Sequence, residues 1–482
     1  MLVILNPIIL NDKSLCDFTT VRDQLEKLQT NKSKGSDQIP PFLLKSSAPD
    51  ICEPVSFIYN LSFKSAKVPH VWKLADVVPV PKSLPVNLEK LRPISLLPIL
   101  GKVLEKLILK KYYVHLMSSV DKSQFAYRSN SSTVCALLAI HDKIVTFLDD
   151  QDITAVRIVT FDMSHAFDCV PHDVLMSRIF ALNFPDCTTF SNWIKNYLCH
   201  RRQRVRIGDR LSSVVDVPSG VPQGSVVGPQ LFSIFMSSYS ACDSNTLVTK
   251  YADDVTLVIP VFKDSSDVLQ TVNNEINHFQ NWCSNNHMKI NQQKTNVLNI
   301  NTARSLLPSV PNLCNVKSLK ILGLIFNEDL SWINHFDYVI SKMSSRLYVL
   351  RMLKPLLSHD ELVNVYNAII RSIVEYASSV FLSPGKCLDL RLLRFCKRAF
   401  YIIHGENVRH CDLCDITAIV ERRRINAMKL FKEIKSNPNH VLHHLLPLTS
   451  SRSNRLILPH AKTMREVNSF IFSCSMLYND TL

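Results

Sequence analysis

Three aspartates have the side-chain type and the sequence setting for metal chemistry. Asp162 lies at the end of the apolar, β-branched run RIVTFDM at 157–163, and Asp253 and Asp254 stand side by side in LVTKYADDVTLVIP. Carboxylates beside buried strands are costly unless they are paired or bound to metal. Oxygen ligands on adjacent strands suit Mg²⁺, and two such ions about 3.5–4 Å apart are the apparatus of nucleotidyl transfer. Asp is also a common turn residue, so YADD alone leaves a turn and a metal site equally open.

The segments that carry these acids have the patterns of strands, with helical segments between them. RIVTFDM predicts a strand, and the two β-rich runs that meet at Ala252-Asp253-Asp254 predict a tight hairpin. A second hairpin is expected around Gly208-Asp209, and KILGLIF at 320–326 is expected to be one strand. Apolar spacing predicts helices at 101–116, 228–241 and 268–283, and in most of the chain from about 333 on. The sequence therefore predicts an α+β fold with a boundary near residue 330.

The composition indicates a polyanionic partner and a reducing compartment. The chain has 482 residues with 55 Lys+Arg against 41 Asp+Glu, a net charge of +14, which favours nucleic acid before membrane. A soluble basic protein without such a partner is the alternative. Fourteen irregularly spaced cysteines do not form a disulfide framework, so we expect an intracellular protein of the nucleus and/or cytoplasm. No apolar run reaches about 18 residues, so no membrane span is expected. Asn6-Pro7 interrupts the apolar opening MLVILNPIIL, and no signal peptide is expected.

Glycine marks one segment before any motif is named. Only nine glycines occur in 482 residues, and three of them, Gly220, Gly224 and Gly228, follow one another at four-residue spacing in SGVPQGSVVGPQ. A chain so poor in glycine places each one where a side chain would not fit.

Three motifs, in order and spacing, resemble the reverse transcriptases of non-LTR (LINE-type) retrotransposons, and most of all the jockey-like group. They are VTFDMSHAFDCVPHDVL, GVPQGSVVGPQLF and YADDVTLV, and the flanking pieces WKLADVVPVPK, LRPISLLPILGKVLEKLI, QFAYRSNSST, HMKINQQKT and LKILGLIFNEDLSW agree. The resemblance runs from about residue 30 to about 335 and is weaker beyond. It implies an RNA-directed DNA polymerase with a right-hand architecture. Residues 1–60 would form an N-terminal helical extension and the start of the fingers, 61–330 the fingers and a palm with a small antiparallel sheet, and 331–482 a helical thumb and C-terminal region.

The resemblance also implies a catalytic site. Asp162 matches the first metal-binding aspartate of the palm, with the Met163 carbonyl as a further ligand, and Asp253 matches the second. Asp254 matches the acid beside it, with a more supportive part. The cofactor would be two Mg²⁺ ions, with Mn²⁺ as an alternative. Asp168, six residues past Asp162, is expected to cap or pair locally instead.

Further positions match residues that bind the incoming dNTP. Phe167 would face its sugar and exclude a 2′-hydroxyl. Gln223 would contact the nucleotide, and Gly224 would let the backbone approach the base pair. Lys294 in NQQKT would lie by the departing pyrophosphate, as charge stabiliser or general acid. Two fingers cations would hold the triphosphate: Lys82 and Arg92.

Basic runs are the candidates for RNA template and DNA primer contacts. HRRQRVRIGDR at 200–210 includes Arg201, Arg202, Arg204 and Arg206, which would contact phosphates unless the segment is only a solvated hairpin face. ERRR at 421–424 is a further candidate for nucleic-acid contact. A zinc site is not expected, because HCDLC lacks a second closely spaced pair. The cysteines and histidines considered for it are His404, His410, Cys411 and Cys414.

Departures from the family pattern leave the expected metal ligands untouched. They are Ala126 in QFAYR, His165 in DMSHAFD and Gln38 in GSDQIP. Only about 30 residues precede the first motif, so we expect the chain to lack the N-terminal endonuclease of such elements. A group II intron-type or telomerase-like reverse transcriptase fits the motifs less well. A catalytically idle RNA-binding remnant is the alternative from another class, and the intact acids argue against it.

Overall fold

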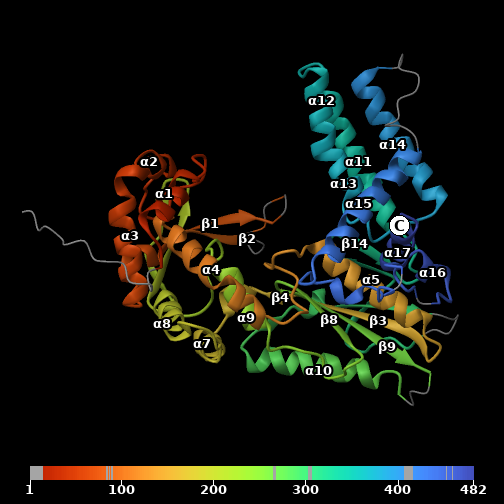
Figure 1. The fold of residues 1–482 in the computed structure, drawn as a ribbon, viewed down its shortest axis with the longest axis horizontal. Helices are drawn as coiled ribbons and strands as arrows, with labels where there is room; N and C mark the ends of the chain where they lie inside the picture. Colours follow the sequence, from red (N-terminus) through yellow and green to blue (C-terminus); the bar gives the residue numbers. More distant parts are fainter. Residues whose placement is uncertain are drawn as a thin grey trace, which may run out of the picture. The chain divides into compact units, whose positions relative to one another are not determined.

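The structure is a computed structural model that describes residues 15–482 except 83–84, 86, 88–90, 264–266, 302–306, 406–415, 452, 459 and 482. The chain divides into two compact units, which are described separately. Unit 1 comprises Met1–Asp121, Ser164–Tyr239 and Trp282–Lys289, and unit 2 comprises Lys122–Met163, Ser240–Asn281 and Ile290–Leu482. Both contain helices and strands (Figure 1), so the α+β class predicted from the sequence is confirmed.

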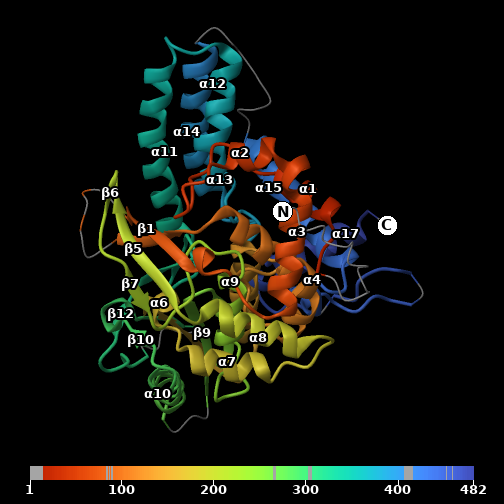
Figure 2. The same cartoon turned by 90° about the vertical axis from the view of Figure 1, so that its left-hand side faces the viewer.

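Unit 1 is built around a small sheet whose strands run in the order β2-β1-β5-β6, with β7 also paired to β5. The strands are β1 (Leu74–Pro81), β2 (Leu91–Leu96), β5 (Arg201–Ile207), β6 (Arg210–Leu211) and β7 (Val215–Val217). β1 is antiparallel to β2 and parallel to β5, and Figure 2 shows β1 beside β5. The hairpin predicted around Gly208-Asp209 is confirmed, because Ile207 pairs with Arg210 and Gly208 has φ 59°.

Helices complete unit 1. Those before and after the first hairpin are α1 (Phe18–Glu26), α2 (Pro41–Ser46), α3 (Ala48–Lys64), η1 (His70–Lys73) and α4 (Ile99–Ser119). Those of the later segment are α6 (Ala166–Cys169), α7 (His172–Phe180), α8 (Cys187–Leu198) and α9 (Gly228–Met236). The helix predicted at 228–241 is therefore shorter than expected, whereas the one predicted at 101–116 is longer.

Unit 2 contains a five-stranded sheet in the order β12-β11-β3-β9-β8. Its strands are β3 (Ile153–Phe161), β8 (Leu247–Tyr251), β9 (Asp254–Phe262), β11 (Asn296–Asn301) and β12 (Cys314–Val316). Neighbours are antiparallel except β11 and β12. The strand and the hairpin predicted for the two acidic motifs are β3 and β8–β9.

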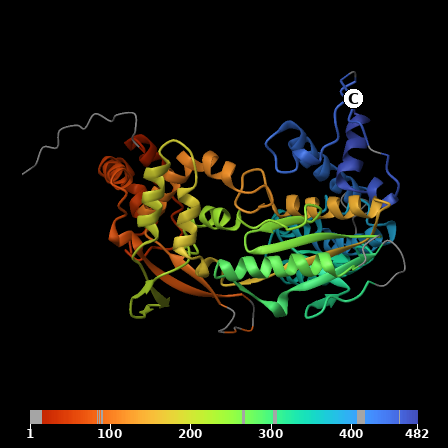
Figure 3. The same ribbon diagram turned by 90° about the horizontal axis from the view of Figure 1, so that it is seen from below.

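The central strand β3 is buried on both faces because a helix covers each (Figure 3). Val156 and Ile158 belong to the same core as α5 (Thr133–Asp149), which begins where the Ser132 hydroxyl accepts a hydrogen bond from the Cys135 amide. On the other face, the Phe161 ring packs against Phe279 of α10 (Gln270–Asn285), with centroids 4.2 Å apart. This packing fixes the end of β3, where Asp162 follows.

The segment KILGLIF is a hairpin, so the prediction of a single strand was wrong. It comprises β13 (Ser318–Ile321) and β14 (Leu324–Asn327). Leu322 and Gly323 form the turn with φ values of 45° and 89°. Positive φ at both central residues is typical of the type I′ turn that matches strand twist, and here a leucine occupies one of them.

The remainder of unit 2 is helical. After α11 (Ile333–Leu353) come α12 (His359–Tyr366), η4 (Asn367–Arg371), α13 (Ser372–Glu375), α14 (Lys386–His404), α15 (Ile416–Ser436), η6 (His443–Leu445), α16 (Met464–Val467) and α17 (Phe470–Asn479). The helices predicted from about residue 333 on are thereby confirmed. They share one apolar core with α5 and the sheet. Over the described residues, none of the helices is both long and apolar enough to span a membrane.

Candidate active site

The register of the unit 2 sheet brings Asp162 and Asp254 to the wall of one cavity. Phe161, the last residue of β3, pairs with Val255 of β9, so the residues just beyond them, Asp162 and Asp254, lie at the same edge. Ala252 and Asp253 form the turn between β8 and β9, in which Ala252 has φ 57°. Asp162 and Asp254 both line a cavity of about 310 Å³. The sheet thus brings together acids that lie 92 residues apart in the chain.

Electrostatics at this wall favour a cation. Partial burial and the nearby charges of Asp253 and Asp162 raise the pKa of Asp254 to about 6, and Lys294 opposes that shift. Lys294 Nζ donates to Asp162 Oδ2 over 2.9 Å, so one ammonium group already contacts a carboxylate of this site. Like-charged carboxylates that repel one another are stabilised by a shared cation.

The donor set fits Mg²⁺. No group of three His, Cys, Asp or Glu side chains within the described ranges is arranged as a complete metal cage. Mg²⁺ is usually bound through one or two carboxylates, with waters and substrate phosphates as the other ligands. Asp162, Asp253 and Asp254 supply oxygens of this kind, and the cavity that Asp162 and Asp254 line leaves room for phosphate.

Lys294 is placed by the backbone of Asp162 itself. It ends the short helix η3 (Gln292–Lys294), in the loop between β10 (Lys289–Ile290) and β11. The Asn291 amide donates to the Asp162 carbonyl over 2.8 Å, and the Lys294 amide donates to the Asn291 carbonyl over 3.1 Å. This loop therefore brings the ammonium to the carboxylate.

Gln124 holds the Asp253 turn, a role that sequence reasoning missed. Its side chain is fully buried, and Oε1 accepts hydrogen bonds from the amides of Ala126 and Ala252, both at 3.1 Å. The backbone of residues 123–125 also forms hydrogen bonds with the backbone of Lys250 in β8. In the sequence, the only indication was that Gln124 is the first residue of QFAYR. This motif supports the resemblance, but it assigned no role to the glutamine.

Phe167 and Gln223 lie in unit 1. The Phe167 ring stacks on Phe232 with centroids 4.3 Å apart, and its carbonyl accepts from the Val221 amide. Gln223 Nε2 donates to both oxygens of Asp168 at 3.3 Å. Asp168 thus fixes the amide of Gln223, and its local partner, as predicted, is His165, with Nδ1 3.8 Å from Oδ2.

The loop that carries Gln223 is anchored from both sides. Gly224 has φ 122°, and a Cβ there would lie 2.6 Å from the Ser95 carbonyl oxygen of β2, so the loop's close approach to β2 requires glycine. Buried Glu105 of α4 accepts hydrogen bonds from the amides of Val226 and Val227 at 2.6 and 3.2 Å. Burial raises the Glu105 pKa, and these bonds oppose the shift. Sequence reasoning missed Glu105 as well. It gave Gly224 a contact with the base pair, which stays a prediction.

Lys82 and Arg92 are exposed at one end of the β1–β2 hairpin. Arg92 of β2 pairs in register with Val80, and Lys82 follows β1 directly. Both cations are therefore available to a ligand in solution, as the triphosphate assignment needs.

The arginines of β5 require a correction. Arg201 is only 3% exposed, lies over the Tyr197 ring and donates to the Tyr197 carbonyl at 3.2 Å. The prediction that it contacts nucleic acid was wrong, because the Tyr197 carbonyl and ring hold its guanidinium in the interior of unit 1. Arg204 and Arg206 are partly exposed and both face the buried carboxylate of Asp76, at 2.7 and 3.9 Å. Arg202 is exposed.

Two further sequence candidates have structural roles. Within ERRR, Arg422 pairs with Glu375, and buried Arg423 pairs with Asp389, each at less than 3 Å. His404 lies against His359, with Nδ1 and Nε2 2.8 Å apart. His410, Cys411 and Cys414 lie outside the described residues.

Comparison with known proteins decides the family. Residues 80–326, just over half of the chain, match the family model "Reverse transcriptase (RNA-dependent DNA polymerase)". The chain belongs to this family. The right-hand fold predicted from the resemblance is that of reverse transcriptases, and the matched range contains all three aspartates and Lys294.

Two relatives of this chain come from mobile elements. It is 26% identical over 452 residues to "RNA-directed DNA polymerase from mobile element jockey" of Drosophila funebris, across 88% of this chain and 48% of that protein. It is 29% identical to "Probable RNA-directed DNA polymerase from transposon BS" of Drosophila melanogaster, across 69% of this chain and 38% of that protein. The chain thus spans about half the length, or less, of the curated relatives it matches. A telomerase of Candida albicans in complex with telomeric RNA aligns with 13% identity and a TM-score of 0.39, across 86% of this chain and 72% of that one, a likeness too weak to carry a conclusion.

Proposed function

We propose that the chain catalyses RNA-directed DNA synthesis, the transfer of a dNMP from a dNTP to a primer 3′-hydroxyl. The observation that carries this proposal is the meeting of Asp162, Asp254 and Lys294 at one cavity at the edge of the unit 2 sheet. Acids and a cation at one open wall suit a reaction in which charge develops on phosphate oxygens. The proposed partners are an RNA template, a DNA primer and dNTPs.

Two Mg²⁺ ions, with Mn²⁺ as an alternative, would be held by Asp162, Asp253 and the Met163 carbonyl, with Asp254 beside them. When bound, such ions lower the pKa of the attacking hydroxyl and stabilise charge on the leaving group. Lys294 would place its ammonium at the departing pyrophosphate and donate a proton or a hydrogen bond to it. Its present bond to Asp162 keeps it within reach of that position.

The unit 1 residues would select and orient the nucleotide. Lys82 and Arg92 would bind the triphosphate, which their exposure on one hairpin end supports. Phe167 would exclude a 2′-hydroxyl by its bulk. Gln223, oriented by Asp168, would contact the nucleotide, and Gly224 would let the backbone approach the base pair.

The assignment of chain segments to the parts of a hand belongs to the same proposal. Residues 1–60 would begin the fingers, 61–330 would form fingers and palm, and 331–482 would form the thumb and C-terminal region. Helices throughout the last range support the thumb assignment. We propose the nucleus and/or cytoplasm as the location, since an RNA template and dNTPs are available there.

Primer extension tests the function. Purified chain with an RNA template, an annealed DNA primer, dNTPs and Mg²⁺ should extend the primer, and omission of Mg²⁺ should stop extension. Asp253→Asn should abolish incorporation and leave RNA affinity nearly unchanged, because affinity comes mainly from basic residues elsewhere. Wild-type chain that binds the RNA but never extends the primer would support the idle remnant, and full activity of Asp253→Asn would contradict the metal assignment.

A further inference from the structure

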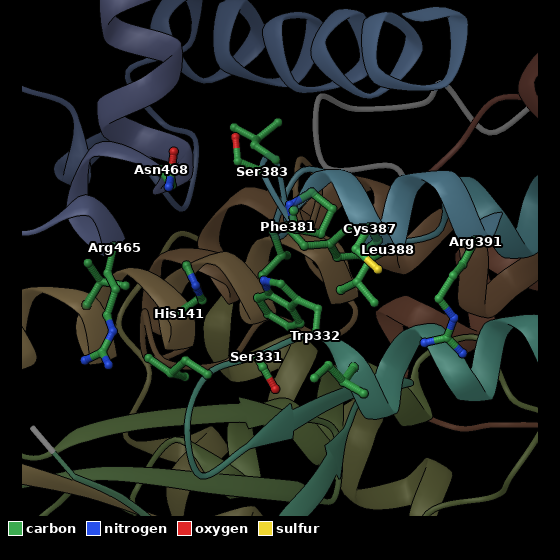
Figure 4. Close-up of a pocket in the computed structure, with 17 residues that line it drawn as sticks. His141, Ser331, Trp332, Phe381, Ser383, Cys387, Leu388, Arg391, Arg465 and Asn468 are labelled. Carbon is green, nitrogen blue, oxygen red and sulfur yellow. The ribbon is translucent and has the colours of Figure 1, made fainter. Parts of the chain in front are cut away.

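A second cavity in unit 2, of about 460 Å³, is separate from the catalytic wall. It lies among α5, the start of α11, the segment before α14 and helix α16, and it shares no lining residue with the cavity beside Asp162 (Figure 4). Its volume falls within the range of about 300–1,000 Å³ that is usual for ligand sites. The proposed polymerase mechanism gives it no role.

The walls of this cavity are aromatic. The Trp332 ring lies 5.7 Å, centroid to centroid, from both His141 and Phe381, and all three residues line the cavity. Val145, Val380 and Leu388 are among the aliphatic residues beside them. A site of this composition suits a flat, unsaturated ring, because aromatic side chains bind bases through their faces and edges.

One wall residue has a hydrogen-bonding capacity that the protein leaves unused. His141 is 8% exposed and makes no hydrogen bond to another described residue. Desolvation lowers its pKa to about 4, so at neutral pH the ring presents one N–H donor and one acceptor nitrogen. Figure 4 shows this ring between Arg465 and Trp332, where it lines the cavity. A ligand with a donor and acceptor edge would provide a hydrogen-bond partner.

The charges at the cavity suit an anion. Arg465 and Arg391 are at opposite sides of the aromatic group in Figure 4, and no Asp or Glu is among the described lining residues. Arg391 is paired with Asp337, whereas exposed Arg465 makes no ion pair with a described residue. A ligand that combines a heteroaromatic ring with a phosphate would use the rings, His141 and Arg465 together.

We propose that this cavity binds one unpaired nucleotide of an RNA strand, with its base beside Trp332, Phe381 and His141 and its phosphate at Arg465. RNA recognition targets unpaired bases that can leave the stack and lie against aromatic side chains. The net charge of +14 favours a strand over a free nucleotide, because flanking phosphates add attraction that a mononucleotide lacks. The proposal rests on the proposed function only in taking RNA as the partner.

The test compares two RNA hairpins that differ by one bulged nucleotide, each bound to the full chain and measured by fluorescence anisotropy at fixed salt. The wild type should bind the bulged hairpin about fivefold or more tightly, the lower end expected for one stacked base. Arg465→Gln and His141→Leu should each remove most of that preference and leave affinity for the fully paired hairpin unchanged. Lys462→Gln, which removes an exposed cation that does not line the cavity, is the matched control and should keep the preference.

Equal affinity of the wild type for the two hairpins would overturn the proposal, as would an Arg465→Gln variant that behaves like Lys462→Gln. Competition by free 5′-mononucleotides at concentrations near those of the RNA would overturn the choice of a strand as the ligand. Because His141 is buried, the exposed Arg465 variant keeps the test decisive if His141→Leu folds poorly. Primer extension on a pre-annealed primer is measured in parallel. Its failure in the wild type would count against the polymerase function, whereas loss of bulge preference with extension intact would count against this site alone.

Discussion

At the residue scale, Phe167 has two roles that can be separated. Its ring stacks on Phe232 within unit 1, which is a packing role, and the family resemblance assigns it the sugar of the incoming nucleotide. A side chain that packs on one face and meets substrate with its edge can serve both. The two roles differ in what a smaller residue would change.

Phe167→Val should raise the kcat/KM for rNTPs relative to dNTPs, because space opens where a 2′-hydroxyl would lie. The ratio of the two kcat/KM values on the same template and primer measures this effect. Phe232→Leu is the matched control: it weakens the same stacking from the buried side and should lower the melting temperature without changing the ratio. If both variants leave the ratio at its wild-type value, Phe167 is only a packing residue.

At the element scale, the turn between β8 and β9 that carries Asp253 depends on a segment outside its own hairpin. Gln124 accepts from the Ala252 amide, and loss of this acceptor would leave that buried amide unpaired, at a cost of about 1–3 kcal/mol. Gln124→Met, of similar length, should loosen the turn that holds Asp253. We expect kcat to fall about 10- to 100-fold, as small misplacements of catalytic groups do, with little change in the KM for dNTP.

The conservative and control variants make this prediction specific. Gln124→Glu keeps an acceptor oxygen and should retain more activity than Gln124→Met. Thr249→Val removes a buried hydroxyl of β8 that has no hydrogen-bond partner among the described residues, and should leave kcat unchanged. Equal kcat values for Gln124→Met and the wild type would show that the turn holds its shape without this bond.

The sequence predicted the elements that carry the acids because their patterns are local. β3 and the β8–β9 hairpin follow from apolar β-branched runs, and α10 follows from its apolar spacing. The hairpin in KILGLIF was missed because Leu322, an apolar residue, occupies a turn position with φ 45°. Periodicity cannot distinguish that leucine from a strand residue.

The supporting residues of the site could not be predicted from the sequence because their partners are distant along the chain. Gln124 and Ala252 are 128 residues apart, and Glu105 and Val226 are 121 apart. The sequence predicted that Arg201 lies on the surface like its neighbours. Its guanidinium instead lies in the interior, over the Tyr197 ring and hydrogen-bonded to the Tyr197 carbonyl. A run of like charges predicts solvent exposure on average, and the contacts of each side chain decide it for each residue.

At the scale of the whole molecule, the net charge of +14 predicts salt-sensitive RNA binding. Each phosphate contact releases condensed counterions, so the logarithm of affinity falls linearly with the logarithm of salt concentration. Not every cation takes part, however. Arg422, Arg423 and Arg204 have carboxylate partners within the protein, so the number of contacts must be smaller than the number of basic residues.

The β5 strand offers a direct test of which cations take part. Arg202→Gln removes an exposed cation and should reduce the salt slope by about 0.7–0.9, the value of one phosphate contact, with an unchanged melting temperature. Arg204→Met removes the 2.7 Å partner of Asp76, a fully buried carboxylate, so its main effect should be a melting temperature several degrees lower. Anisotropy titrations of one RNA at four salt concentrations, with thermal melts of both variants, measure these quantities. The opposite pattern, with Arg202→Gln unstable and its slope unchanged, would mean that β5 presents its arginines to the protein interior and not to RNA.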